Sequence, residues 1–346
     1  MTTETKISYI EYIRVYAAVA VVFLHIVMTL NNNYEINELG VFNYTVFSDC
    51  YMLVKWAVPC FIMITGALLL NPMKSVDVQK IKKYVLRMIE VLLTFGVLYA
   101  LMEIIFTEKT FHIGMFLKAL LHTAEGQSWS HMWYIYALIP MYIIALPLRD
   151  FIKAENRKTI QLFIVVLIVG NFIVPTINAV FNIDIKTLMP FGEYITYFVI
   201  GYYLSTLPIK FISRTKPILI GGGLAVTIAM IALETYSLQV NQMEIAVNHS
   251  SGELLTLLQS VSIFMLVRLV FGNKDTTSIV KSVSRCSFGI YLIHPLWINL
   301  IYKVLKITPL SMPIGVGIVV LWLFVFLLSF GSAWIMKRLP VIKKII

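Results

Sequence analysis

The sequence contains little charge: Lys, Arg, Asp and Glu make up 13% of its 346 residues, against 59% hydrophobic residues. A soluble globular protein needs about 25% charged residues to cover its surface. The shortage excludes a soluble domain of ordinary composition and indicates that most of the outer surface faces lipid. A lipid-embedded chain of 346 residues has room for about ten helices of about 20 residues joined by short loops.

Cysteines are scarce as well. Cys50, Cys60 and Cys286 form no CxxC pair and have no metal-ligand spacing. An odd, scattered set argues against a disulfide framework and a metal site, so we interpret them as small apolar residues. Repeats, low-complexity segments and long loops are absent too, which leaves no room for a separate soluble domain. The sequence therefore predicts one integral-membrane domain over residues 1–346, with any chemistry inside the helical bundle and no permanently bound cofactor.

Ten apolar stretches predict an all-α, polytopic bundle of about ten transmembrane helices. No small-residue cleavage site follows the first stretch, so we interpret it as a retained helix. The stretches fall near residues 8–30, 48–70, 84–106, 132–149, 159–181, 188–206, 217–238, 252–271, 283–302 and 313–336.

The basic residues indicate orientation rather than nucleic-acid binding, although the net charge is +10. With the N-terminus inside, the inner segments contain twenty Lys and Arg residues and the outer loops contain five. This asymmetry predicts that both termini are cytoplasmic. The longest outer connection, 107–131, mixes apolar residues with Lys118 and His122, which is typical of a short helix at the membrane interface.

Charged and polar groups within the predicted spans are costly, so each one needs a reason. Arg14 and His25 are eleven residues apart, which places them on one face of the first helix, about 16 Å apart along its axis. Arg14 could also snorkel to the inner headgroups, and His25 could be only an interhelical hydrogen-bond donor. These alternatives stay open.

Six further groups lie within or near the spans: Lys55, Glu90, Glu103, Glu234, Arg268 and His294. We interpret most of them as structural partners or as residues near the membrane interface, and Glu103 and Glu234 as solvated at the outer boundary. Four cations, Lys80, Lys82, Lys83 and Arg87, precede the third apolar stretch. They either enforce topology or bind a polyphosphate such as coenzyme A at the inner face.

Five segments of the chain resemble the acyltransferase-3 family of bacterial membrane acyltransferases, in the family's order and over nearly the whole chain. The first, "YIRVYAAVAVVFLHIV", looks like the family's first helix, in which Arg and His are separated by ten residues. The others are "VPCFIMITGALLL", "HMWYIYALIPMY", "YFVIGYYLS" and "SRCSFGIYLIHPL".

The resemblance implies transfer of an acyl group, commonly acetyl, from cytoplasmic acyl-CoA to a hydroxyl of an extracytoplasmic or lipid-linked glycan. Arg14 and His25 match the family's essential pair. Arg87 matches a basic position that opens the third helix, where the family often has Arg-x-x-Arg and this chain has Tyr84 with Lys83 beside it. Thr65 replaces the usual Ser before Gly66, and Glu103 matches an acidic position.

The expected mechanism has the donor phosphates on Lys80, Lys82, Lys83 and Arg87, and the pantetheine arm passing Arg14. His25 then acts as general base on the acceptor hydroxyl, with His294 or Ser287 in support. The resemblance places such an enzyme in the bacterial cytoplasmic membrane, with acyl-CoA, glycan and lipid as its partners and no nucleic acid. Two rival functions stay open: a transporter or exporter of a polysaccharide or its precursor, and a sensor or structural component.

Overall fold

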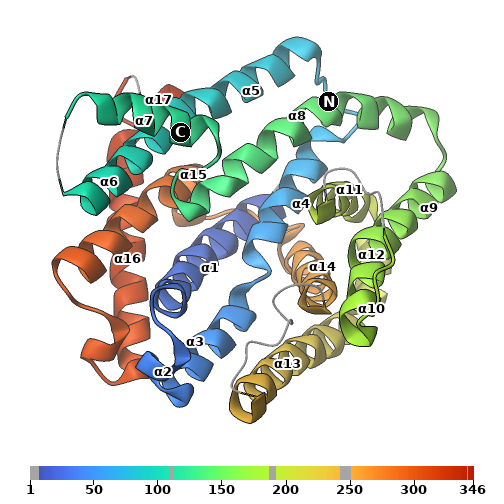
Figure 1. Ribbon diagram of the computed structural model, residues 1–346. Coiled ribbons are helices and arrows are strands. Elements are labelled where there is room, and N and C mark those ends of the chain that lie inside the picture. The colour runs from blue at the N-terminus through green and yellow to red at the C-terminus, as the bar shows by residue number, and fades with distance from the viewer. Residues whose placement is uncertain (1–7, 110–111, 187–191, 242–250, 341) are drawn as a thin grey trace. The chain divides into compact units, whose positions relative to one another are not determined.

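The structure, a computed structural model, describes residues 8–109, 112–186, 192–241, 251–340 and 342–346. All the regular structure in these ranges is helical (Figure 1). The chain divides into two compact units, which we call unit 1 and unit 2. Unit 1 comprises Met1–Leu68 and Arg157–Trp334, and unit 2 comprises Leu69–Asn156 and Ile335–Ile346.

Unit 1 contains the helices from the N-terminal part of the chain together with most of those that follow residue 156. They are α1 (Ser8–Asn33), α2 (Ile36–Leu39), α3 (Val41–Val54), α4 (Ala57–Leu69), α9 (Arg157–Ile168), the π-helical turn η3 (Val169–Ile173), α10 (Val174–Phe181), α11 (Gly192–Thr206), α12 (Ile209–Arg214), α13 (Lys216–Asn241), α14 (Ser251–Phe271), α15 (Ser278–Asn299), the π-helical turn η5 (Leu300–Val304), the 3₁₀ turn η6 (Pro309–Ser311) and α16 (Ile314–Met336).

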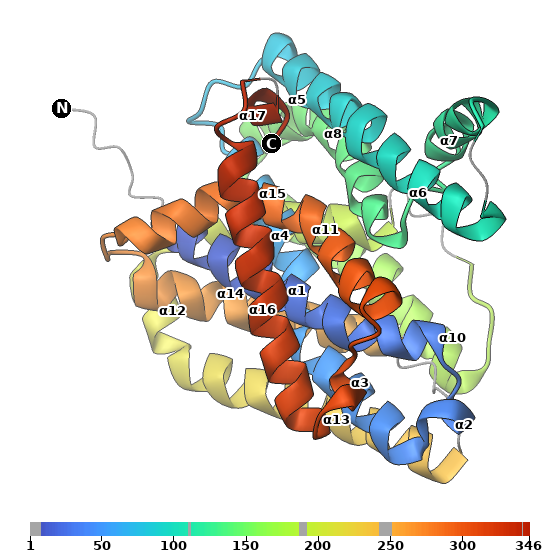
Figure 2. The same ribbon diagram turned by 90° about the vertical axis from the view of Figure 1, so that its left-hand side faces the viewer.

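Helix α1 is surrounded by other helices of unit 1 and contacts α3, α14 and α15. Two of its backbone carbonyls accept side-chain hydrogen bonds from these surroundings: Val19 from Trp322 Nε1 at 3.0 Å and Ile26 from the Tyr302 hydroxyl at 3.1 Å. Helix α16 lies beside α15 (Figure 2), to which it is joined by a hydrogen bond from the Trp297 indole. Polar donors thus fix α1 in position within an otherwise apolar core.

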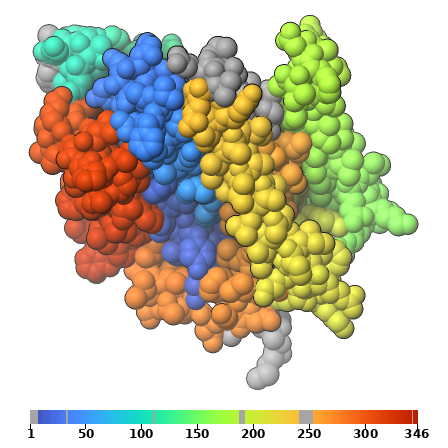
Figure 3. All heavy atoms as spheres, turned by 90° about the horizontal axis from the view of Figure 1, so that it is seen from below, coloured from blue at the N-terminus to red at the C-terminus, as the bar shows by residue number. Residues whose placement is uncertain are grey.

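The second predicted span is a broken helix, α3 followed by α4, with a turn at Lys55 and Trp56. Pro59 explains the break, because it has no N–H to donate to the carbonyl four residues earlier. On the face seen in Figure 3, α13 (yellow) lies alongside α3 (blue), with which it is in contact. The two helices are linked by hydrogen bonds from the Thr235 hydroxyl to both carboxylate oxygens of Asp49, at 2.9 and 3.0 Å.

Two glycines bring the backbones of α4 and α11 together. A Cβ added to Gly66 would lie 1.8 Å from the Phe198 carbonyl oxygen, and one added to Gly201 would lie 2.1 Å from that of Met63. Neither position therefore accepts a larger residue without moving the backbone. The close approach of the two backbones therefore depends on a residue without a side chain at both positions.

Unit 2 is smaller and is built around α5 and α8, which pack against each other. Helix α5 begins after Asp77, whose carboxylate accepts a hydrogen bond from the Lys80 backbone N–H at 2.8 Å and so caps the helix. The elements of unit 2 are α5 (Val78–Val91), the π-helical turn η1 (Leu92–Gly96), α6 (Val97–Glu108), α7 (Gly114–Ala124), the 3₁₀ turn η2 (Ser130–Met132), α8 (Trp133–Ala154) and α17 (Ile342–Ile345).

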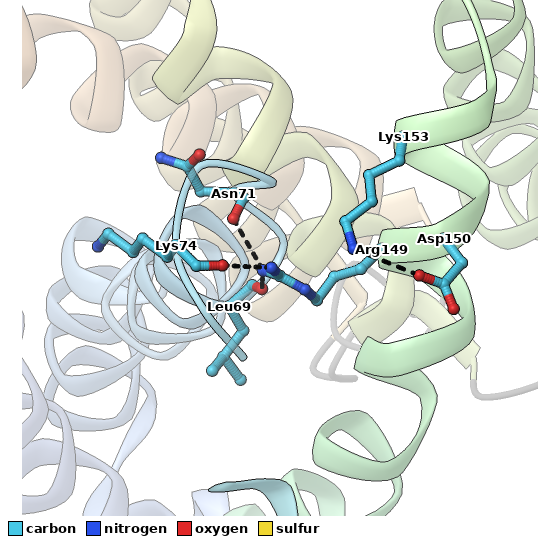
Figure 4. A network of polar contacts seen from close by, with 6 residues as sticks. All are labelled: Leu69, Asn71, Lys74, Arg149, Asp150 and Lys153. Carbon is cyan, nitrogen blue, oxygen red and sulfur yellow. Dashed lines mark hydrogen bonds and ion pairs between the residues drawn. The ribbon is translucent and has the colours of Figure 1, made fainter. Parts of the chain in front are cut away.

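Arg149, on α8, is 2% exposed and donates to three backbone carbonyls where α4 ends (Figure 4). Its guanidinium contacts the carbonyl oxygens of Leu69 and Asn71 at 2.5 and 2.8 Å, and that of Lys74 at 2.5 Å. Helix C-termini leave carbonyls without intrahelical partners, and a cation satisfies them well. Arg149 therefore fixes the connection that leads into α5.

Helices occupy all ten predicted ranges, apart from the part of 188–206 that lies outside the described residues. Within the described residues, eight helices are long and apolar enough to cross a membrane. The other two ranges contain α11, which has 15 residues, and α15, which carries Arg285 and several serines. The predicted helix within 107–131 is present as α7.

The interpretation of Glu234 as a solvated residue is wrong, because its side chain is fully buried on α13. Its place near the end of an apolar stretch suggested exposure, but neighbouring helices cover that part of α13. Lys55 and Arg268 are structural partners, as predicted. The Lys55 ammonium lies 3.0 Å from Glu253, and Arg268 donates to the carbonyls of Leu204 and Leu207 at 2.5 and 2.6 Å.

Candidate functional site

His25 lies on α1 with a half-buried side chain. Its Nδ1 is 2.9 Å from the Val21 carbonyl oxygen, one turn earlier on the same helix. A carbonyl oxygen can only accept, so Nδ1 must be the nitrogen that carries the proton. In the neutral ring, Nε2 then has the lone pair. The helix thus fixes the tautomer of His25 and leaves Nε2 as its basic nitrogen.

His294, on α15, is the neighbour of His25 in the core of unit 1. Its ring centroid is 4.7 Å from that of His25, the two rings are inclined at 62°, and the side chain of His294 is fully buried. Its Nδ1 lies 3.1 Å from the Ile290 carbonyl oxygen, so the same argument gives it the same tautomer. Two segments that resemble the family, far apart in the sequence, therefore meet at this pair of rings.

The other predicted residues of unit 1 lie farther along the same elements. Arg14 is half-buried on α1, which is continuous from Ser8 to Asn33, so the predicted separation of about 16 Å from His25 along the axis holds. Ser287 is buried on α15, two turns before His294, and donates to the Ser284 carbonyl at 2.9 Å. Thr65, on α4, donates to the Phe61 carbonyl at 2.9 Å.

Glu103 belongs to unit 2, where its exposed carboxylate accepts a hydrogen bond from Trp129 Nε1 at 3.1 Å. The Trp129 ring stacks on Tyr99 with the centroids 4.4 Å apart. Buried His131 meets Tyr99 edge-on at 5.3 Å. The predicted acidic residue thus belongs to an aromatic cluster of its own unit.

The predicted cations line a pocket of about 830 Å³ in unit 2, whose lining belongs to α5 and the C-terminal segment. Helix α5 contributes Lys82, Lys83 and Arg87 to the lining, together with one carboxylate, that of Glu90. Lys80 is not part of the lining, because its ammonium turns back to the Ser75 carbonyl at 3.1 Å. The pocket therefore contains three of the four predicted donor-binding cations.

Two further cations of this pocket, Lys343 and Lys344, come from α17 and were not predicted as site residues. In the sequence they are separated from α5 by about 250 residues and carry no motif. Their only signal was the basic charge of the C-terminal segment, which we interpreted as topology. With them the lining has five cationic side chains and one acidic side chain, an excess that attracts anions.

Within the described residues, no three His, Cys, Asp or Glu side chains are placed to hold a metal ion together. The two sites offer different chemistry. A neutral imidazole with a basic Nε2 can accept a proton from a hydroxyl group. A pocket with several cations can bind a phosphorylated ligand.

Comparison with known families gives a match that covers nearly the whole chain. The family model described as an acyltransferase domain, that of the acyltransferase-3 family, matches residues 7–338. Neither the curated proteins nor the solved structures gave a match. The family predicted from the five segments is thereby confirmed: this chain belongs to the acyltransferase-3 family, whose shared domain is an acyltransferase.

Proposed function

We propose that this protein is a membrane O-acyltransferase that moves an acyl group, commonly acetyl, from cytoplasmic acyl-CoA to a hydroxyl of an extracytoplasmic or lipid-linked glycan. Family membership supports acyl transfer as the activity and favours it over the exporter and sensor alternatives. The donor, the acyl group and the acceptor are our proposals. So are the residues that act on them.

The observation that carries the proposal is the tautomer of His25. Because Nδ1 donates to the Val21 carbonyl, Nε2 is the nitrogen that can take a proton. A general base needs such a lone pair within hydrogen-bond reach of the acceptor hydroxyl. The ring lies among buried helices, where a fixed orientation costs no reorganisation at the moment of reaction.

The transfer step follows from this assignment. The acceptor hydroxyl gives its proton to Nε2 of His25, and its oxygen forms a bond to the thioester carbonyl carbon. The carbon–sulfur bond then breaks, and the thiolate leaves with the electron pair. His25 returns the proton to the sulfur, so that CoA leaves as the thiol and the imidazole is neutral again.

Other residues of unit 1 have supporting roles in this proposal. His294 packs against His25 and keeps its ring in place. Arg14 is about 16 Å from His25 along α1, too far for both to contact one carbonyl, so it binds the donor's arm instead. Ser287 and Thr65 are the hydroxyl groups we assign to stabilising the oxyanion, each after turning its proton away from the backbone carbonyl that now accepts it. We give Glu103, in unit 2, no more than an indirect role.

The donor phosphates bind to Lys82, Lys83 and Arg87. These cations line one pocket, and charge-assisted hydrogen bonds to phosphate are strong and geometrically specific. We retain Lys80 as a distal contact, because a lysine side chain is long and flexible. In this proposal the pantetheine arm presents the thioester to His25.

The proposed topology has ten spans with both termini in the cytoplasm of a bacterial cell, so that the enzyme is a multi-pass protein of the cytoplasmic membrane. It rests on the asymmetry of basic residues and on the ten helical ranges. A reporter fused after Ile346 that is active only in the cytoplasm should give a signal. A signal from a reporter that is active only outside the membrane would contradict the topology.

Activity is tested with the purified full chain, acetyl-CoA and a panel of candidate glycans. We expect free CoA to be released only when a suitable glycan is present, and labelled acetyl to appear on that glycan. Transport of an unmodified glycan without release of CoA would favour the exporter alternative. Failure to release CoA with a glycan that the same preparation acetylates from another labelled acetyl thioester would exclude acetyl-CoA as the donor.

A further inference from the structure

The C-terminal helix α17 is attached to α5 beside the proposed donor cations. Arg87 Nε donates to the Ile345 carbonyl at 2.7 Å, and the two helices are in contact. Figure 2 shows α17 (dark red) next to α5 (cyan). The family match ends at residue 338, before α17 begins. This half of the pocket is therefore a feature of this chain beyond the matched domain.

The two groups of cations face one volume from different segments. Lys82, Lys83 and Arg87 come from α5, whereas Lys343 and Lys344 come from α17. Among the residues that the structure describes, none of the four lysines forms an ion pair. The five cationic side chains of the lining outnumber its one acidic side chain, that of Glu90, so they repel one another and a ligand with phosphates in two places would relieve the repulsion.

The pocket also offers an aromatic ring. Tyr84 is part of the lining, and Tyr142 of α8 packs against it with the ring centroids 5.5 Å apart. A nucleobase stacks on such a ring because every base has a π-face. The volume of about 830 Å³ lies within the range of about 300–1,000 Å³ typical of small-molecule pockets. Cations from two segments and an aromatic ring together match a nucleotide phosphorylated at two positions.

We propose that Lys343 and Lys344 bind the 3′-phosphate of CoA, while the α5 cations bind its diphosphate and Tyr84 stacks on the adenine. The proposal rests on the proposed function, since it assumes that the acyl donor is a CoA thioester. It adds a selection rule. Carrier-protein thioesters end in phosphopantetheine and lack the nucleotide, so this pocket rejects them as donors.

Phosphate could also reach this pocket on an anionic lipid headgroup. The experiment therefore uses the full chain in nanodiscs of phosphatidylcholine, with and without phosphatidylglycerol. Titration calorimetry gives the Kd of CoA and of 3′-dephospho-CoA. The variants are Lys343→Gln with Lys344→Gln, the charge-preserving pair Lys343→Arg with Lys344→Arg, and a control that removes two lysines outside the lining, Lys153→Gln with Lys158→Gln.

We expect the unaltered protein to bind CoA about tenfold to a hundredfold more tightly than 3′-dephospho-CoA, the usual range for a charged hydrogen bond. The variant with Lys343→Gln and Lys344→Gln should lose this preference, because only its binding of CoA is weakened and its binding of 3′-dephospho-CoA is unchanged. The Arg pair and the control should keep the preference, in both lipid mixtures.

The assignment of Lys343 and Lys344 to the 3′-phosphate would be overturned if the Gln variant kept the preference for CoA, or if it bound both ligands more weakly by the same factor. Either result would leave the proposed function in place. Loss of CoA binding in phosphatidylglycerol nanodiscs alone would assign the pocket to lipid headgroups. Absence of CoA binding in either lipid would contradict the CoA-dependent function itself.

Discussion

The histidine pair of unit 1 and the cation pocket of unit 2 hold their polar groups by opposite means. His25 and His294 each direct Nδ1 to a carbonyl of their own helix, among packed apolar side chains. The four lysines of the pocket have no acidic partner among the described residues and lie around an open volume. The first arrangement fixes the orientation of a ring, and the second leaves charge available to a ligand.

This difference predicts different consequences of mutation. A group with fixed orientation acts in the chemical step, so its loss lowers kcat. A group that attracts a ligand acts in binding, so its loss raises KM or Kd. The substitutions below test this division.

The largest effect is expected for His25→Ala. A positioned general base contributes about 10²–10⁴-fold, so turnover should fall by about that factor, while the Kd of CoA stays unchanged. The measurements are steady-state kinetics of CoA release and calorimetry on the same preparation. The control is His112→Ala, which removes an exposed histidine of unit 2 and should alter neither quantity. If His25→Ala lost CoA binding along with turnover, the assignment of His25 to the chemical step rather than to binding would be contradicted.

The next effect concerns the pocket. Replacing Lys82, Lys83 and Arg87 together by Gln should raise the KM for acyl-CoA about a hundredfold or more, because several charge-assisted contacts to phosphate are lost. The difference from the unaltered protein should shrink at high salt, since salt screens the same charges. An unchanged KM at normal expression would mean that these cations serve topology alone.

Arg149→Gln tests stability rather than activity. The substitution removes charged hydrogen bonds to three carbonyls of the α4–α5 connection, each worth about 1.5–3 kcal/mol. We expect a clear fall in Tm in detergent. The matched control, Lys153→Gln on the same helix, removes only an exposed pair with Asp150 at 3.5 Å (Figure 4) and should change Tm little. Equal shifts for the two variants would contradict the capping role of Arg149.

The sequence predicted local features well. Periodicity located the helices, and the spacing of Arg14 and His25 gave their common face. These features depend on residues that are close in the chain, so they can be predicted from hydropathy and helical geometry.

The features that the sequence did not predict depend on contacts between distant segments. The two α17 lysines reach the α5 pocket only because the chain folds. Lys80 lies outside the pocket lining because its ammonium donates a hydrogen bond to the Ser75 carbonyl, which cannot be predicted from the number of charges in the segment. Glu234 is buried because other helices cover it. His294 was a candidate from its motif, but its contact with His25 required the packing of α1 on α15.

The central claim is that His25 is the general base, and His25→Asn tests it most directly. Asparagine retains a hydrogen-bonding side chain in the helix interior but cannot take up the proton of the acceptor hydroxyl. The measurement is glycan-dependent release of CoA from acetyl-CoA by the purified variant, with the Kd of CoA determined in parallel. We predict that CoA still binds and that glycan-dependent release falls by about 10²–10⁴-fold. Near wild-type transfer by His25→Asn would contradict the account, making His25 a helix-packing residue and His294 the next candidate for the base.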